Sequence, residues 1–109
     1  MKNPTSDKNQ NISQKSERDV NMDDEIKMFK TILKNISNIG DGEYFLSGFF
    51  RKNGFRPLGH QINVLKYILQ LLNIPVYQKF WKGKGRLSWA IYVDDQARVR
   101  IKKFLDMAA

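Results

Sequence analysis

The sequence contains no cysteine, and its only histidine is His60. Without cysteine, the chain cannot form disulfide bridges or cysteine-based zinc sites. His60 stands in a loop before a helix, and no acidic residue lies close to it in the sequence. We therefore expect it to be a surface residue at the helix start rather than a catalytic base. The residues alone indicate no metal site and no resident cofactor.

Long apolar segments are also missing. Residues 1–20 lack the apolar region of a secretory signal peptide, and their acidic residues argue against a transit peptide. The apolar segment 44–54 is too short, and too close to Arg51 and Lys52, to cross a membrane. We expect an intracellular protein without a membrane partner. A composition rich in Lys, Asn and Ile hints at an organelle or a mobile element as its source.

Acidic side chains are absent from Tyr44 through Val93, although the whole chain contains 11. The formal net charge is +8 and the isoelectric point is near 9.8. Such a stretch predicts a surface that faces a polyanion, with nucleic acid the favoured partner. Charge that serves solubility alone is the alternative. The basic residues of the stretch are Arg51, Lys52, Arg56, Lys66, Lys79, Lys82, Lys84 and Arg86.

Composition divides the chain into a tail and one domain. Residues 1–21 are rich in Asn, Gln, Ser, Lys and Asp and offer almost nothing to bury, which predicts a disordered polar tail. Residues 22–109 are enough for a single small core, and we expect one basic α+β domain there.

Hydrophobic spacing and turn residues place the expected elements within this domain. They are helices over 23–39, 44–54 and 61–73, strands over 76–82 and 86–93 joined by a Gly83-Lys84-Gly85 turn, and a closing helix over 96–105.

Three expectations concern details of these elements. Asp41 and Glu43 should lie at the start of the 44–54 helix, where negative charge is favourable. Gly48 should let another helix backbone come close. In the second strand, the alternating residues should face the core; they are Leu87, Trp89, Ile91 and Val93. The first strand alternates less clearly, and leaves open which of Phe80 and Trp81 is buried.

The segment Leu46–Gly54, LSGFFRKNG, resembles the nine-residue motif of LAGLIDADG homing endonucleases. The leucine, the small residue, both glycines and the apolar pair match. The two acidic positions do not, because Arg51 and Asn53 occupy them. Asn53 stands where the family holds its catalytic metal ion, so whether the protein is an enzyme stays open. Mg²⁺ is the cofactor that an active endonuclease would need.

The resemblance continues weakly to residue 105 and implies a LAGLIDADG-like half-unit, with three to four helices and a C-terminal β-hairpin. Single-motif members of the family form homodimers by packing their motif helices. The implied interface is Leu46, Ser47, Gly48 and Phe50. The helix over 23–39 could make the same contact within one monomer. Between Gly54 and Gln61 the chain is too short for the first strand pair of the family, so the unit is shortened and degenerate.

A winged helix is the alternative fold, because it also places a basic hairpin after three helices. In that arrangement, the helix over 61–73 would enter a DNA groove and Lys82–Gly85 would form the wing. In either fold, the hairpin interleaves cations with aromatic residues on a projecting element. Candidate DNA-binding residues are Arg51, Lys52, Arg56, Lys66, Lys79, Trp81, Lys82, Lys84 and Arg86.

Three functions follow from these patterns. The first is a cleavage-deficient, homodimeric protein that binds double-stranded DNA. The second is an active Mg²⁺-dependent homing endonuclease. The third is an RNA-binding or ribonucleoprotein module that uses the same basic hairpin and tail.

Overall fold

The computed structural model describes the backbone of residues 9–108 and the side chains of residues 23–108. Within this part, the chain forms four helices and a three-stranded antiparallel sheet, so the α+β class is confirmed. The elements in order are α1 (Asn9–Ile36), β1 (Gly42–Phe45), α2 (Leu46–Lys52), α3 (Gly59–Leu71), β2 (Tyr77–Trp81), β3 (Arg86–Val93) and α4 (Asp95–Ala108).

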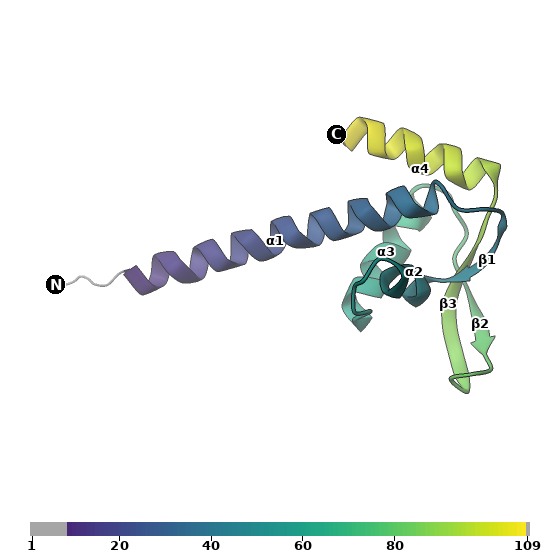
Figure 1. Cartoon of the computed structure of the whole chain (residues 1–109), viewed down its shortest axis with the longest axis horizontal. Coiled ribbons are helices and arrows are strands. Elements are labelled where there is room, and N and C mark those ends of the chain that lie inside the picture. Colours follow the sequence, from purple (N-terminus) through teal and green to yellow (C-terminus); the bar gives the residue numbers. More distant parts are fainter. Residues whose placement is uncertain (1–8, 109) are drawn as a thin grey trace.

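Helix α1 begins earlier in the chain than the expected helix over 23–39. Its first half extends away from the other elements (Figure 1). Residues 9–21, whose composition predicts a disordered tail, continue α1 as helical backbone, because polar residues such as Gln, Lys and Glu disfavour burial but not helix formation. Residues 1–8 of that predicted tail lie outside the described residues.

The expected helix over 44–54 is wrong in its first part, because Gly42–Phe45 form strand β1 and only Leu46–Lys52 are helical. Strand β1 pairs antiparallel with the second half of β3, residues 90–93, with Phe45 opposite Ala90. This pairing between distant segments outweighs the local signals for a helix start. Asp41 and Glu43 therefore do not cap a helix, and each makes an ion pair with a distant basic residue.

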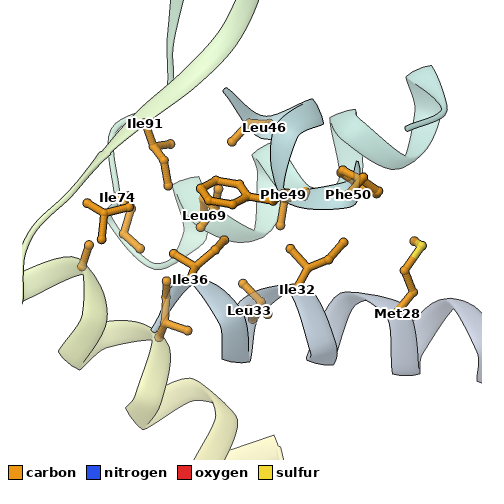
Figure 2. Close-up of a cluster of buried hydrophobic side chains, with 14 residues drawn as sticks. Met28, Ile32, Leu33, Ile36, Leu46, Phe49, Phe50, Leu69, Ile74 and Ile91 are labelled. Atoms are coloured by element: carbon orange, nitrogen blue, oxygen red, sulfur yellow. The ribbon is translucent and has the colours of Figure 1, made fainter. Parts of the chain in front are cut away.

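The sheet has the order β1-β3-β2, and one of its faces carries the core. Ile91 and Val93 of β3 are fully buried on that face, against α1, α2 and α3. Figure 2 shows Ile32 and Ile36 of α1 pointing toward Phe49 of α2. The opposite face of the sheet carries no helix in Figure 1.

The expected ends of α2 and α3 are confirmed by their backbone geometry. The chain leaves α2 through Asn53 and Gly54, and Gly54 has a φ of 83°, a conformation that favours glycine. The amide of Phe55 then bonds back to the Phe50 carbonyl at 2.8 Å. Helix α3 ends similarly at Asn73, which has a φ of 61°. Both ends close on hydrogen bonds that satisfy the last carbonyls of the helix.

Helix α4 packs against α1 and closes the core. Its inner residues Ala97 and Ile101 are buried, as the spacing predicts, and the Asp94 carboxylate accepts a 2.9 Å hydrogen bond from the Ala97 amide. Arg98 is not on the outer side. It donates to the Ile39 carbonyl and pairs with Asp41, which ties α4 to the turn after α1.

Candidate nucleic-acid interface

The tip of the β2–β3 hairpin presents the densest group of exposed cations in the sequence-predicted set. Lys82, Lys84 and Arg86 are all exposed there. The amides of Lys84 and Gly85 both donate to the Trp81 carbonyl, and Gly85 takes up a φ of 64°. This turn holds the three cations at the end of a projecting element, at a distance from the carboxylates around β1.

Trp81 lies on the open face of the sheet, not among the core residues. Its indole stacks on the Phe45 ring, with centroids 4.7 Å apart and an interplanar angle of 11°. The two rings come from opposite edges of the sheet and meet over β3. They can do so because the central strand has the small residues Ala90 and Ser88 on this face. Phe80 points the other way and is 56 % exposed.

Two cations lie over the Trp81 ring. The guanidinium carbon of Arg51, at the end of α2, is 5.7 Å from the ring centroid, and the Lys84 ammonium is 5.5 Å away. Arg51 and Trp81 are far apart in sequence, so the fold brings together two members of the predicted set. Both cations keep exposed charge for an anion while they pack on the ring.

Lys79 lies on the same face but already has a partner. It makes an ion pair with Glu43, whose carboxylate also accepts a 2.6 Å hydrogen bond from the Tyr77 hydroxyl. Lys79 and Tyr77 together lower the pKa of Glu43. Burial, followed by the bond to Glu43, raises the pKa of Tyr77 to about 12. Lys79 is therefore a weaker candidate for binding an anion than the cations at the tip.

On the other side of the hairpin, α3 turns a polar face to solvent. Asn63, Tyr67 and Gln70 recur there at helical spacing, opposite the buried Leu65 and Leu69. None of these three residues belongs to the sequence-predicted set of binding residues. Their position opposite the buried stripe of the helix could have identified them as solvent-facing residues.

Lys66, one of the candidate DNA-binding residues, does not face solvent freely. Its ammonium lies 4.2 Å from the centroid of the Trp89 ring, so it bridges α3 and β3. A groove of about 360 Å³ runs alongside, between the first turns of α3 and the hairpin. It is lined by Ser47, Gly59, Ile62, Asn63, Arg86, Leu87, Ser88 and Trp89.

Leu87, expected in the core, lies on the expected face of β3 but is 56 % exposed. It stands near the hairpin tip, beyond the reach of the helices that cover Ile91. Lys52 and Arg56 are also exposed, at the end of α2 and in the loop that leads to α3. The predicted cations thus fall around the hairpin and the α2–α3 connection, with Lys79 and Lys66 held by other side chains.

The residues of the implied dimer interface are mostly used inside the monomer. Leu46 and Phe50 are fully buried, and Phe50 meets Phe29 of α1 edge-on with ring centroids 6.3 Å apart. Helix α1 therefore packs on part of the implied interface within the monomer. The expectation for Gly48 is wrong, because a methyl group built there would meet nothing within 4 Å.

Asn53 and His60 both interact with neighbouring groups. The Asn53 amide donates to the Phe49 carbonyl at 2.7 Å, so it closes the end of its own helix. His60 lies in the first turn of α3, 3.6 Å from the Glu25 carboxylate of α1. Within residues 23–108, no group of three or more His, Asp or Glu side chains is placed to hold a metal ion.

None of the described helices combines the length and the apolar composition that a membrane crossing needs. Comparison of the chain with protein-family models, curated protein sequences and solved structures finds no match in any of the three.

Proposed function

We propose that this protein binds double-stranded DNA through a winged-helix arrangement, with α3 in the major groove and the β2–β3 hairpin as the wing. One observation carries the proposal: Asn63 of the polar face of α3 and Arg86 of the basic hairpin tip line the same groove. The order helix, strand, helix, helix and hairpin supports it, as does the short glycine-containing connection between α2 and α3.

The chemistry of the two elements suits different parts of a duplex. Asn63 and Gln70 carry amides that can pair with the major-groove edge of adenine, and they lie two turns apart on α3. Lys82, Lys84 and Arg86 carry point charges and a guanidinium that suit phosphates, where contacts fix position rather than sequence. The absence of carboxylates from Tyr44 through Val93 removes repulsion along this surface.

We also propose that the protein lacks cleavage activity, despite its resemblance to LAGLIDADG endonucleases. The residue at the family's metal-holding position is an amide, and it bonds to its own helix. Plasmid incubated with the protein and Mg²⁺ should stay supercoiled. Nicking that disappears when Asn53 is replaced would instead establish the endonuclease.

The primary test is the affinity for mixed-sequence duplex DNA and for matched RNA, titrated across salt. Changing Lys82 and Lys84 to alanine should reduce the salt slope of duplex binding by about 1.8, because each phosphate contact contributes about 0.9. Lys103→Ala, on the outer side of α4, removes a charge far from the hairpin and should leave the slope unchanged.

Three results would contradict parts of the proposal. No duplex binding at low salt would refute DNA binding itself. Duplex binding with an unchanged slope in the lysine variant would exclude the hairpin from the interface. Tighter binding to RNA than to duplex would favour the ribonucleoprotein function.

Asn63→Ala should weaken the preference among duplex sequences while leaving the salt slope intact, because the amide contacts bases and not phosphates.

A further inference from the structure

Helix α1 carries an exposed stripe on the side that faces away from the core. Asp23, Ile26, Lys30 and Lys34 follow one another at intervals of three, four and four residues, so they share one face of the helix. All four are exposed, and Ile26 is 51 % exposed. DNA binding through α3 and the hairpin makes no use of this stripe.

The basic end of the stripe borders a groove of about 510 Å³ between α1 and α4. Lys102 adds a third ammonium group to those of Lys30 and Lys34, and Leu105 supplies apolar surface. A single carboxylate, that of Asp106, lines the groove. The groove is therefore positively charged and suits an acidic partner.

The acidic end of the same stripe, in a second copy of the chain, is such an acidic partner. Asp23 and the adjacent Asp24 are exposed, about two to three turns before the lysines along α1. Within residues 23–108, the ion pairs of the structure involve neither these two carboxylates nor Lys30 and Lys34. The charge along the stripe thus changes sign around Ile26.

We infer that α1 pairs with α1 of a second copy, running antiparallel, with the two-fold axis beside Ile26. A two-fold axis makes each contact occur twice, so Asp23 faces Lys30 of the second copy while Lys30 faces its Asp23. The exposed Ile26 side chains meet near the axis and exclude water. Parallel pairing would instead oppose like charges along the whole stripe.

The shape of α1 also favours a partner. The helix spans 28 residues, which corresponds to about 42 Å, and its first half extends away from the remaining elements (Figure 1). A largely polar helix that leaves its globular unit is marginal in water without a surface to pack on. The second copy supplies that surface. This interface is separate from the one that the LAGLIDADG resemblance implies.

Sedimentation velocity at low and high salt tests the pairing. The wild-type chain should be a dimer that dissociates as salt rises, because the contacts are exposed ion pairs. Lys30→Glu with Lys34→Glu should raise the dimer dissociation constant at least about tenfold. Asp23→Lys with Asp24→Lys should do the same. Lys30→Glu combined with Asp23→Lys should restore the dimer, because these two side chains face each other across the axis and their signs are exchanged.

Lys82→Glu with Lys84→Glu is the matched control, since it alters the net charge equally but at the hairpin tip. It should leave the dimer intact while weakening DNA binding, which separates this inference from the proposed function. A wild-type monomer at low salt would overturn the pairing. So would a dimer that survives the Lys30 and Lys34 changes, or a variant with both Lys30→Glu and Asp23→Lys that has native circular dichroism but stays monomeric.

Discussion

Replacing Gly48 with alanine should stabilise the protein, although the sequence motif suggests the opposite. Gly48 lies within α2, and a methyl group there would meet no atom within 4 Å. Alanine in a helix is favoured over glycine by about 0.5–1 kcal/mol, because glycine loses more backbone entropy on folding. Gly48 lies in the first turn of a short helix, so we expect a gain of about 0.5 kcal/mol, the lower end of that range.

Thermal unfolding followed by circular dichroism measures this gain. A change of 1 kcal/mol shifts the midpoint of a domain of this size by about 4–8 °C, so Gly48→Ala should raise it by about 2–4 °C. Gly54→Ala is the matched comparison. It places a side chain at a φ of 83°, where an L-residue costs about 1–2 kcal/mol, and should lower the midpoint.

A loss of stability in Gly48→Ala would refute this reasoning. It would mean that another backbone packs against the glycine, as in the motif-helix contact of the LAGLIDADG family. Equal shifts in the two variants would show that the local conformation at Gly54 differs from the one described. Opposite signs at the two glycines are the expected outcome.

Two further predictions concern the core and the open face of the sheet. Phe50→Leu should lower the free energy of unfolding by about 1–2 kcal/mol, because it loses the edge-on contact with Phe29 and leaves a small void. Phe80→Leu, at an exposed site, should lower it by less than about 0.5 kcal/mol. Equal losses for the two variants in chemical denaturation would contradict the assignment of Phe50 to the core. In the folded state the pKa of Glu43 is lower than its ordinary value of 4.5, so the ionised carboxylate stabilises the fold at pH values above 4.5. This contribution is lost as the pH falls through the folded-state pKa. The difference in thermal midpoint between wild type and Glu43→Gln should therefore be constant above pH 4.5 and shrink below it; a difference that persists at low pH would show that the charge is not its cause.

The elements that the sequence predicts well are those whose signal is local. Helix α3 has a buried stripe at helical spacing and stops before Pro75, and the hairpin has alternating residues around a Gly-Lys-Gly turn. Strand β1 is missed because it spans only Gly42–Phe45, and it is a strand only by virtue of its pairing with β3. No local pattern within four residues reports a partner so distant in the chain.

The candidate site also has some features that local sequence predicts and others that depend on distant parts of the chain. The exposure of the cations at the hairpin tip is predictable, since a turn with two glycines projects into solvent. The environment of Trp81 is not, because it depends on Phe45 from the opposite edge of the sheet and on the small size of Ala90 between them. Lys66 is missed for a similar reason: its packing on Trp89 depends on how α3 lies against β3.

The positions of Trp81 and Trp89 give the protein two fluorescent reporters of its own. They are the only tryptophans in the chain and lie on opposite faces of the sheet. Trp81 reports on the stack with Phe45 on the open face, while Trp89 lines the groove beside α3. Variants that keep a single indole, Trp81→Phe or Trp89→Phe, would show from the quenching of the remaining emission which face of the sheet a ligand covers.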